Sequence, residues 1–223
     1  MINFITSNLL WSCGWPVTLF LGFLLLLSLF FHKLLFIFVP LFLFAFYFFR
    51  NPERICKATL TDSSVLVCPS DGKVLSVEKG DFDDYKQKVT IFLSPLDVHV
   101  NWIPYSGIID EINYRPGKFL MAFEPKSSEF NERNDIVLLL NLSGHTERAC
   151  NASRSILVRQ IAGFIARRIC CWVKSGESVN VGQKYGMIRF GSRIEVFLPE
   201  NVDIEIKEGQ KILGGETILG RFR

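Results

Sequence analysis

The chain has 223 residues, 49% of them hydrophobic, and a formal net charge of +3 at pH 7, which suits one sizeable domain with an appendage. Lys33 is the only charged residue among residues 1–49, so residues 50–223 carry 24 basic and 22 acidic residues. A domain so close to neutral has no basic excess of the kind that binds nucleic acid, and we exclude nucleic acid as a partner.

The stretch over residues 17–49 is almost wholly apolar, interrupted only by His32-Lys33 and a few small residues. A secretory signal would have basic residues before its apolar run and a small-residue cleavage site after it, and neither is present. The stretch is long for one span of about 20 residues and short for two, so a single span and a hairpin turning at His32-Lys33 both stay open. Because Arg50 follows directly, we predict that residues 1–49 are a helical anchor in the cell membrane, with residues 50–223 on the cytoplasmic side.

After Pro52 the sequence changes to short apolar runs separated by turn residues, which predicts a β-rich domain. Two such runs flank Pro69-Ser-Asp-Gly-Lys, so we expect a hairpin or a β-arch with Asp71-Gly72 at its tip. Further strands are predicted at residues 88–94, 107–113, 136–142 and 155–161.

An approximate internal repeat lies in the C-terminal third. Residues 173–183 and 206–216 share apolar, Lys and Gly positions at the same spacing. Paired hairpins of this pattern are typical of flattened β-barrels of the biotinyl and lipoyl kind, an architecture that does not by itself identify an activity. We therefore predict a mainly β fold, a flattened barrel or sandwich of the barrel-sandwich hybrid kind, behind an N-terminal hydrophobic helical anchor.

The dipeptide Gly191-Ser192 lies inside residues 185–199, where we predict a strand from Ile188 to Leu198. Apolar residues alternate from Ile188 onward, and Ser192 falls on their core-facing side. A buried hydroxyl needs a partner, because an unsatisfied one costs about 1–3 kcal/mol. The ordinary interpretation is a Gly-Ser bulge whose hydroxyl bonds a neighbouring carbonyl. The alternative is that Ser192 attacks the carbonyl of Gly191 and cleaves its own chain.

Among the three histidines, His99 alone lies in a structured, apolar context, at residues 96–104. On its own it is more typical of a hydrogen-bonded core residue than of a catalytic one. The six cysteines form no CxxC motif and have no His at ligand spacing. We therefore expect reduced thiols and no metal site.

Seven short motifs between Phe48 and the C-terminus form a specific combination. They are Phe48-Phe-Arg-Asn-Pro-Glu-Arg54, Pro69-Ser-Asp-Gly-Lys-Val74, Phe92-Leu-Ser-Pro-Leu-Asp-Val-His-Val-Asn101, Pro116-Gly-Lys-Phe-Leu120, Asn131-Glu-Arg-Asn134, Gln160-Ile-Ala-Gly-Phe-Ile-Ala-Arg-Arg168 and Ile188-Arg-Phe-Gly-Ser-Arg193. Taken together, they resemble phosphatidylserine decarboxylase, most closely its short proenzymes of bacterial and archaeal type.

This resemblance implies a lyase that is made as a zymogen and cuts itself between Gly191 and Ser192. The products would be a β chain of residues 1–191 and an α chain of residues 192–223, which remain together as a heterodimer. Ser192 would become a covalent pyruvoyl group, the cofactor, which forms a Schiff base with the amine of phosphatidylserine in the membrane. Loss of carbon dioxide would then give phosphatidylethanolamine.

The resemblance also implies roles for two further residues. Asp71 matches the acidic residue of the family's Asp-Gly-Lys motif and is a candidate to orient a base or to accept the Ser192 proton, although it could simply form a turn. His99 becomes a candidate catalytic acid or base. Longer family members have a second His three residues later, credited with self-processing, where this chain has Trp102. The base that activates Ser192 is therefore open.

Two alternatives to this function also stay open. A decarboxylase of the same chemistry could act on archaetidylserine or another lipid with a phosphoserine headgroup. A non-enzymatic, membrane-tethered barrel-sandwich adaptor would use Gly191-Ser192 only as a bulge. A higher oligomer is compatible with each of these functions.

Overall fold

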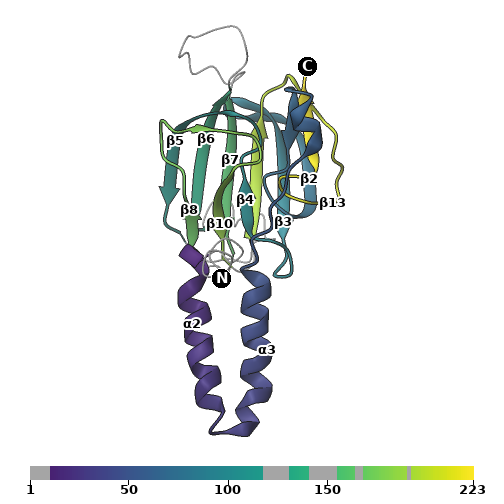
Figure 1. The fold of residues 1–223 in the computed structure, drawn as a ribbon. Helices are drawn as coiled ribbons and strands as arrows, with labels where there is room; N and C mark the ends of the chain where they lie inside the picture. Colours follow the sequence, from purple (N-terminus) through teal and green to yellow (C-terminus); the bar gives the residue numbers. More distant parts are fainter. Residues whose placement is uncertain (1–10, 118–130, 141–154, 164–167, 190–191) are drawn as a thin grey trace. The chain divides into compact units, whose positions relative to one another are not determined.

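Two units make up the chain, Met1–Glu53 and Arg54–Arg223 (Figure 1). The structure, a computed structural model, describes residues 11–117, 131–140, 155–163, 168–189 and 192–223. Each unit is described by itself below.

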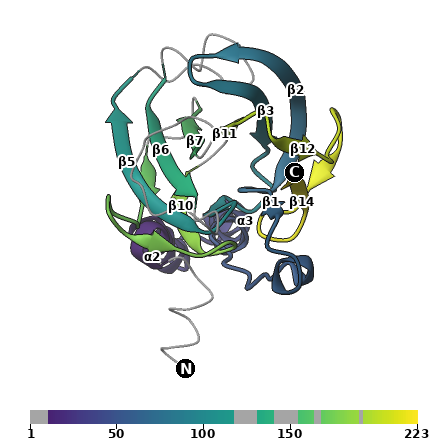
Figure 2. The same ribbon diagram turned by 90° about the horizontal axis from the view of Figure 1, so that it is seen from above.

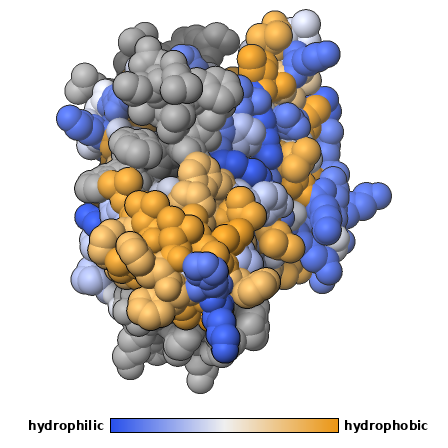
Figure 3. All heavy atoms as spheres, turned by 60° about the horizontal axis from the view of Figure 1, so that its bottom comes forward, coloured by the Kyte–Doolittle hydropathy of each residue, from blue (hydrophilic) through white to orange (hydrophobic). Residues whose placement is uncertain are grey.

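The first unit contains two antiparallel helices, α2 (Trp11–Ser28) and α3 (His32–Phe48). The turn between them lies directly before His32, so of the two arrangements compatible with the sequence the chain adopts a helical hairpin. Both helices are apolar on all sides, and large side chains such as Phe30 and Phe36 are more than four-fifths exposed. Figure 3 shows such side chains gathered on one continuous area of the surface. Within the described residues, neither helix combines the length and the hydrophobicity that crossing a bilayer requires.

The second unit is built on one large, curled sheet whose strands wrap part of the way around the core (Figure 2). Its eight strands, in spatial order, are β13 (Lys211–Ile212), β2 (Gly72–Phe82), β3 (Tyr85–Leu93), β11 (Ser192–Leu198), β7 (Ser155–Ala162), β6 (Arg133–Leu140), β5 (Gly107–Arg115) and β9 (Ser178–Val179). All neighbouring strands are antiparallel. The prediction of a mainly β domain is confirmed.

Two small sheets complete this unit, together with the 3-10 turn η1 (Lys57–Leu60). One consists of β1 (Val65–Val67), β14 (Ile218–Phe222) and β12 (Val202–Ile204), and the other of β4 (Val100–Trp102), β10 (Lys184–Ile188) and β8 (Ile169–Cys171). The continuous hydrophobic core draws on the large sheet and on residues of both small sheets, including Leu66 and Ile188. β1 and β2 belong to different sheets, so the segment around Asp71 is a β-arch and not a hairpin.

The internal repeat in the sequence is also a repeat in the structure. β8, β9 and β10 are followed 33 or 34 residues later by β12, β13 and β14. Gly176 and Gly209 occupy the same position in the two copies, and both have a positive φ, 83° and 81°. Gly182 and Gly215 match in the same way, with φ of 76° and 74°. Because glycine tolerates this conformation at no steric cost, the repeated glycines specify the same two turns in each copy.

Two expectations from the sequence are wrong. Residues 188–198 do not form one strand, because β10 ends at Ile188 in a small sheet and β11 begins at Ser192 in the large one. The apolar alternation continues across the point where the chain changes sheets and therefore conceals it. The cysteines are also not all reduced thiols, since Cys170 is disulfide-bonded, whereas Cys56, Cys68 and Cys171 are free.

Candidate active site

Ser192 is the first residue of β11, which lies between β3 and β7 near the middle of the large sheet. It is paired with Leu93 on one side and Ala162 on the other, and both belong to the hydrophobic core. Ser192 is fully buried, and its Oγ has no hydrogen-bond partner within the described parts of the chain. The prediction that Ser192 faces the core is thus confirmed, while Gly191 lies outside the described residues.

The opposite face of β11 is held by charged side chains. Arg193 and Glu195 are both at least 95% buried and lie 3.3 Å apart. Arg159 lies 3.8 Å from Glu195 and is anchored to Asp135 through a bidentate pair at 2.8 and 2.9 Å. Paired charges of this kind are costly to disrupt, so they hold the strand that carries Ser192 in a fixed position.

His99 is connected to the surroundings of Ser192 from two directions. Leu93, directly opposite Ser192, leads into a turn closed by Asp97, whose Oδ2 accepts a 2.7 Å hydrogen bond from the Ser94 N–H. Two residues beyond this turn, the carbonyl of His99 accepts a hydrogen bond from the N–H of Ile188 at 3.3 Å. Ile188 is only four residues before Ser192. His99 is therefore connected to two segments that lead to Ser192, the turn after Leu93 and the end of β10.

The ring of His99 is fully buried, and a hydrogen bond at Nδ1 helps to fix its orientation. Nδ1 lies 2.9 Å from the backbone oxygen of Asp97. Because a carbonyl oxygen can only accept, Nδ1 must carry the proton, and the neutral ring then has its lone pair on Nε2. This tautomer allows Nε2 to accept a proton.

Asp71 is buried, and hydrogen bonds occupy both of its carboxylate oxygens. Arg54 binds the carboxylate through two nitrogens, one of them 3.1 Å from Oδ2. The backbone N–H groups of Gly214 and Val98 donate to it at 2.9 and 3.3 Å. Asp71 therefore joins three distant segments of the chain, and through Val98 it holds the residue directly before His99.

Trp102, where longer relatives have a second His, is a packing residue. The Arg54 guanidinium carbon lies 5.0 Å from the centre of its ring. On Gly214 an added Cβ would lie 2.5 Å from the ring, and on Gly215 2.9 Å. The indole is thus enclosed, and it has no lone pair with which to accept a proton.

Three buried amide side chains form a hydrogen-bonded chain across the core. Asn134 Nδ2 donates to Gln160 Oε1 at 2.9 Å, and Gln160 Nε2 donates to Asn101 Oδ1 at 2.7 Å. All three side chains are at least 98% buried. Gly186 makes room for this chain, because a Cβ there would lie 3.1 Å from Gln160 Nε2. We refer to Asn134, Gln160 and Asn101 as the amide chain.

The sequence analysis did not single out the amide chain, Arg54 or Gly214. Four of these five residues nevertheless occur in the quoted motifs, as polar residues next to apolar ones. That signal could have identified Arg54, Asn101, Asn134 and Gln160. Gly214 lies in none of the motifs, and its role depends on a backbone N–H that any residue type except proline would supply.

Two further titratable side chains of the second unit, Tyr185 and Cys171, stay neutral at pH 7. Burial raises the pKa of the Tyr185 phenol well above its usual value. Burial also raises the pKa of the Cys171 thiol. Neither group can supply an anionic base or nucleophile there. In the described ranges, no three His, Cys, Asp or Glu side chains are grouped in a way that could hold a metal ion.

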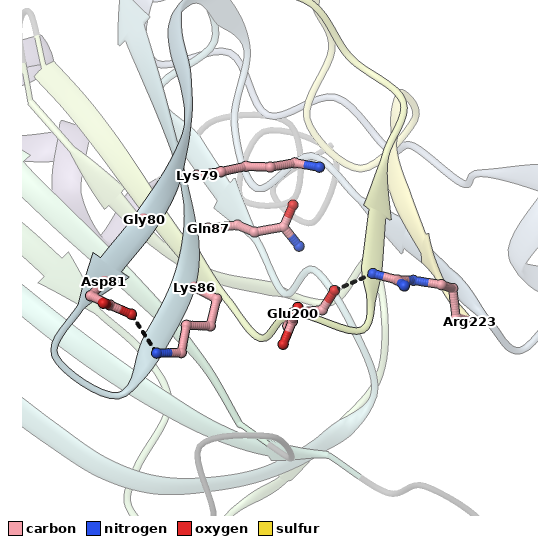
Figure 4. Close-up of a pocket in the computed structure, with 7 residues that line it drawn as sticks. All are labelled: Lys79, Gly80, Asp81, Lys86, Gln87, Glu200 and Arg223. Carbon is pink, nitrogen blue, oxygen red and sulfur yellow. Dashed lines mark hydrogen bonds and ion pairs between the residues drawn. The ribbon is translucent and has the colours of Figure 1, made fainter.

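A polar pocket of about 400 Å³ lies at the other end of β11 (Figure 4). It is lined by Lys79, Gly80, Asp81, Lys86, Gln87, Glu200 and Arg223. Gln87 pairs with Leu198, six residues beyond Ser192, which places the pocket about 20 Å along the strand from it. None of the predicted site residues lines this pocket, so it is separate from the candidate site.

Comparisons with known proteins identify the same family that the sequence motifs resemble. A family model described as phosphatidylserine decarboxylase matches residues 41–220. The chain is 42% identical over 217 residues to the phosphatidylserine decarboxylase proenzyme of Syntrophus aciditrophicus, covering 94% of this chain and 95% of that protein. It is 39% identical to the proenzyme of Desulfotalea psychrophila, covering 85% and 84%, and 44% identical to that of Chlorobium phaeobacteroides, covering 81% and 80%. With matches over most of its length, the chain belongs to the phosphatidylserine decarboxylase family.

Proposed function

We propose that this protein is a proenzyme that cuts itself between Gly191 and Ser192 and then converts phosphatidylserine to phosphatidylethanolamine and carbon dioxide. Relatives that span most of this chain are phosphatidylserine decarboxylase proenzymes. For this chain, the proposal rests on the burial of Ser192 and on its unpartnered hydroxyl. Its hydroxyl is fully buried, within the family's cleavage motif, with no hydrogen-bond partner among the described residues.

An unpartnered buried hydroxyl costs stability, and a covalent role accounts for its presence. In the proposed self-cleavage, Ser192 Oγ adds to the carbonyl carbon of residue 191 while its proton passes to a base. His99 Nε2 is the base that the geometry supports, since Nδ1 is committed as a donor to Asp97. Trp102 cannot substitute, because an indole has no lone pair for a proton.

Asp71 acts in this proposal by positioning and not as a base. Arg54 and two backbone N–H groups already occupy both of its oxygens. These contacts fix the carboxylate in place and direct its oxygens at Arg54 and the two N–H groups. What it contributes is a fixed position for Val98, and therefore for the neighbouring His99.

The residues around Ser192 fit a pyruvoyl group at this position. Formation of the group consumes the Ser192 hydroxyl, which has no partner among the described residues. Leu93 and the small Ala162 flank it on the core face and exclude water. When formed, the pyruvoyl ketone binds the headgroup amine and withdraws electrons as carbon dioxide leaves. His99 is placed to hold or return a proton next to it.

Residues 1–49 act in this proposal as a membrane anchor for the decarboxylase. The helical hairpin exposes many large apolar side chains, among them Phe30 and Phe36. Transfer of such a surface from water to an apolar phase lowers the free energy. Because the substrate's acyl chains lie in a bilayer, an anchor of this kind would keep the catalytic unit near its substrate.

The test of this function is the substitution Ser192→Ala. Wild-type protein should yield two chains, the smaller one comprising residues 192–223 with a blocked N-terminus, and should release carbon dioxide from phosphatidylserine. The Ser192→Ala protein should remain a single chain without decarboxylase activity. Intact-mass spectrometry and a labelled carbon dioxide assay measure both outcomes. Two chains in the Ser192→Ala protein would exclude Ser192 as the self-cleaving residue.

A further inference from the structure

We propose that Asn101 is a further catalytic residue of self-cleavage. Its side-chain Nδ2 would hydrogen-bond the oxygen that becomes negatively charged when Ser192 adds to the peptide bond before it. This inference rests on the proposed function, and it assigns a role that neither the motifs nor the family comparisons supply.

Asn101 itself has the features of such a donor. Its side chain is fully buried, and its Oδ1 accepts from Gln160 at 2.7 Å, yet its Nδ2 has no hydrogen-bond partner in the described parts of the chain. A buried N–H without an acceptor costs about 1–3 kcal/mol. Native proteins retain such groups rarely, and a catalytic role is one of the reasons.

The hydrogen bonds of the amide chain both run in one direction, from Asn134 toward Asn101. Asn134 donates to Gln160, and Gln160 donates to Asn101, so the oxygens of Gln160 and Asn101 are each bonded to the amide before them. This order fixes which end of the Asn101 side chain is the donor. It also polarises the last amide, because each hydrogen bond strengthens the next in such a series. The amide chain thus ends in the N–H₂ group of Asn101, which has a defined orientation.

Strand pairing relates the position of Asn101 to that of Ser192. Ser192 pairs with Ala162, and Ile194 pairs with Gln160, so Gln160 is a diagonal neighbour of Ser192 on the core face of the sheet. Diagonal neighbours in antiparallel strands lie about 7–8 Å apart. The Asn101 amide is bonded directly to Gln160 and is therefore one hydrogen bond away from this neighbour of Ser192. Asn101 is also only two residues from His99.

Self-cleavage would begin at the Ser192 hydroxyl. The Ser192 Oγ–H bond breaks, its proton passes to His99 Nε2, and Oγ forms a bond to the carbonyl carbon before Ser192. The carbonyl π electrons move to the oxygen, which accepts a hydrogen bond from Asn101 Nδ2. When the oxyanion collapses, the C–N bond breaks, and the Ser192 nitrogen takes the proton from His99. The product is an ester in place of the amide.

Two other buried donors, the Arg54 guanidinium and Trp102 Nε1, do not suit the role of hydrogen-bonding the oxyanion. Arg54 is committed to the Asp71 carboxylate. The Trp102 Nε1–H also lacks a partner in the described residues, but consecutive strand residues point to opposite faces, so it lies on the other side of β4 from Asn101. An added Cβ on Gly215 would be only 3.1 Å from Trp102 Nε1, so this nitrogen is packed closely against Gly215.

The experiment follows the rate of self-cleavage in pulse-labelled full-length chains made by cell-free synthesis with detergent. Asn101→Ala removes the donor, and Asn101→Asp keeps the shape and the acceptor for Gln160 but has no N–H. Each should slow cleavage by about 10²–10³-fold, the usual cost of removing one oxyanion donor. Circular dichroism checks the fold, and if the alanine variant does not fold, Asn101→Asp decides.

Gln87→Met is the matched control, because it removes a buried amide with two hydrogen bonds, 2.9 and 2.8 Å, at the far end of the same strand pair. It should reduce thermal stability and leave the cleavage rate unchanged. If Gln87→Met slows cleavage as much as the Asn101 variants do, the effect is a general loss of packing, and the proposal is wrong.

Hydroxylamine distinguishes the step that is blocked, since it cuts esters readily and amides only slowly. Uncleaved Asn101→Ala chains should resist it, because they have not formed the ester. Hydroxylamine-induced cutting at residues 191–192, or cleavage of folded Asn101 variants at the wild-type rate, would overturn the proposal. An uncleaved wild-type protein would instead contradict the proposed function, so the two failures are distinguishable.

Discussion

At the scale of single residues, one backbone carbonyl determines which nitrogen of His99 can act. The oxygen of Asp97 lies 2.9 Å from Nδ1 and requires a proton there. Nε2 is therefore the only nitrogen of the neutral ring that can take a proton from Ser192. The tight turn between Ser94 and Asp97 sets this geometry, so the tautomer of the neutral ring is determined by the local backbone.

The first prediction is that His99→Ala slows self-cleavage by about 10²–10⁴-fold, the usual contribution of general base catalysis. Pulse-labelled chains separated on a denaturing gel measure the rate. His32→Ala is the control, because His32 is exposed at the start of α3, and its cleavage should match the wild type. Normal cleavage and normal turnover in His99→Ala would remove His99 from the mechanism.

Only part of the candidate site could be predicted from the sequence. Ser192 stands out because a hydroxyl interrupts an apolar alternation, and His99 because it is the one histidine in a structured apolar context. The amide chain gives no such signal, since its hydrogen bonds join residues 26 and 59 positions apart. Such pairings depend on which strands become neighbours, and local patterns do not encode that.

At the scale of structural elements, the ion pair of Arg54 and Asp71 holds the β-arch between β1 and β2. The two side chains are only 10% and 6% exposed. Arg54 also donates to the carbonyl of Gly214 at 3.0 Å, so the pair ties the arch to the second copy of the internal repeat. The arch in turn positions the strand that begins with Val100.

The second prediction is that Arg54→Leu lowers the free energy of unfolding by about 3–5 kcal/mol, because it leaves the Asp71 charge buried without its partner. Denaturant unfolding should be measured on Ser192→Ala protein, so that one intact chain unfolds. Lys86→Leu is the control, since it breaks the exposed pair with Asp81 and should have no measurable effect. Equal stabilities of the two variants would contradict this account.

Most strands and the internal repeat could be predicted, because alternation and paired glycines are local signals. The break between β10 and β11 could not. Apolar residues keep their two-residue period from one strand into the next, and only Gly191 marks the change of sheets. The choice between a hairpin and an arch at Asp71 was also open, because it depends on the distant strand β14, which pairs with β1.

At the scale of the whole molecule, the division into Met1–Glu53 and Arg54–Arg223 separates the apolar hairpin from all of the candidate catalytic residues. Ser192, His99, Asp71 and Asn101 all belong to the second unit. Tethering raises the concentration of a site near its target but adds nothing to bond cleavage. The two units are therefore expected to have separable tasks.

The third prediction is that a protein lacking residues 1–49 still cuts itself, as measured by intact mass. Its activity should fall on phosphatidylserine vesicles, because it lacks the apolar hairpin, and should be better preserved on short-chain substrate in detergent. The full-length protein, assayed in parallel on both substrates, is the control. A truncated protein that is folded by circular dichroism but uncleaved would show that the hairpin takes part in maturation.

The place of the cut within the sheet order changes the kinetic order of folding. Residues 192–223 supply β11 near the middle of the large sheet, β13 at its edge, and two strands of a small sheet that also contains β1. In the uncut chain these strands insert in a first-order reaction. After the cut the same insertion joins two separate molecules, so its rate depends on their concentration. In dilute solution the mature protein would lose activity at the rate of its first unfolding event, whereas the proenzyme could refold many times.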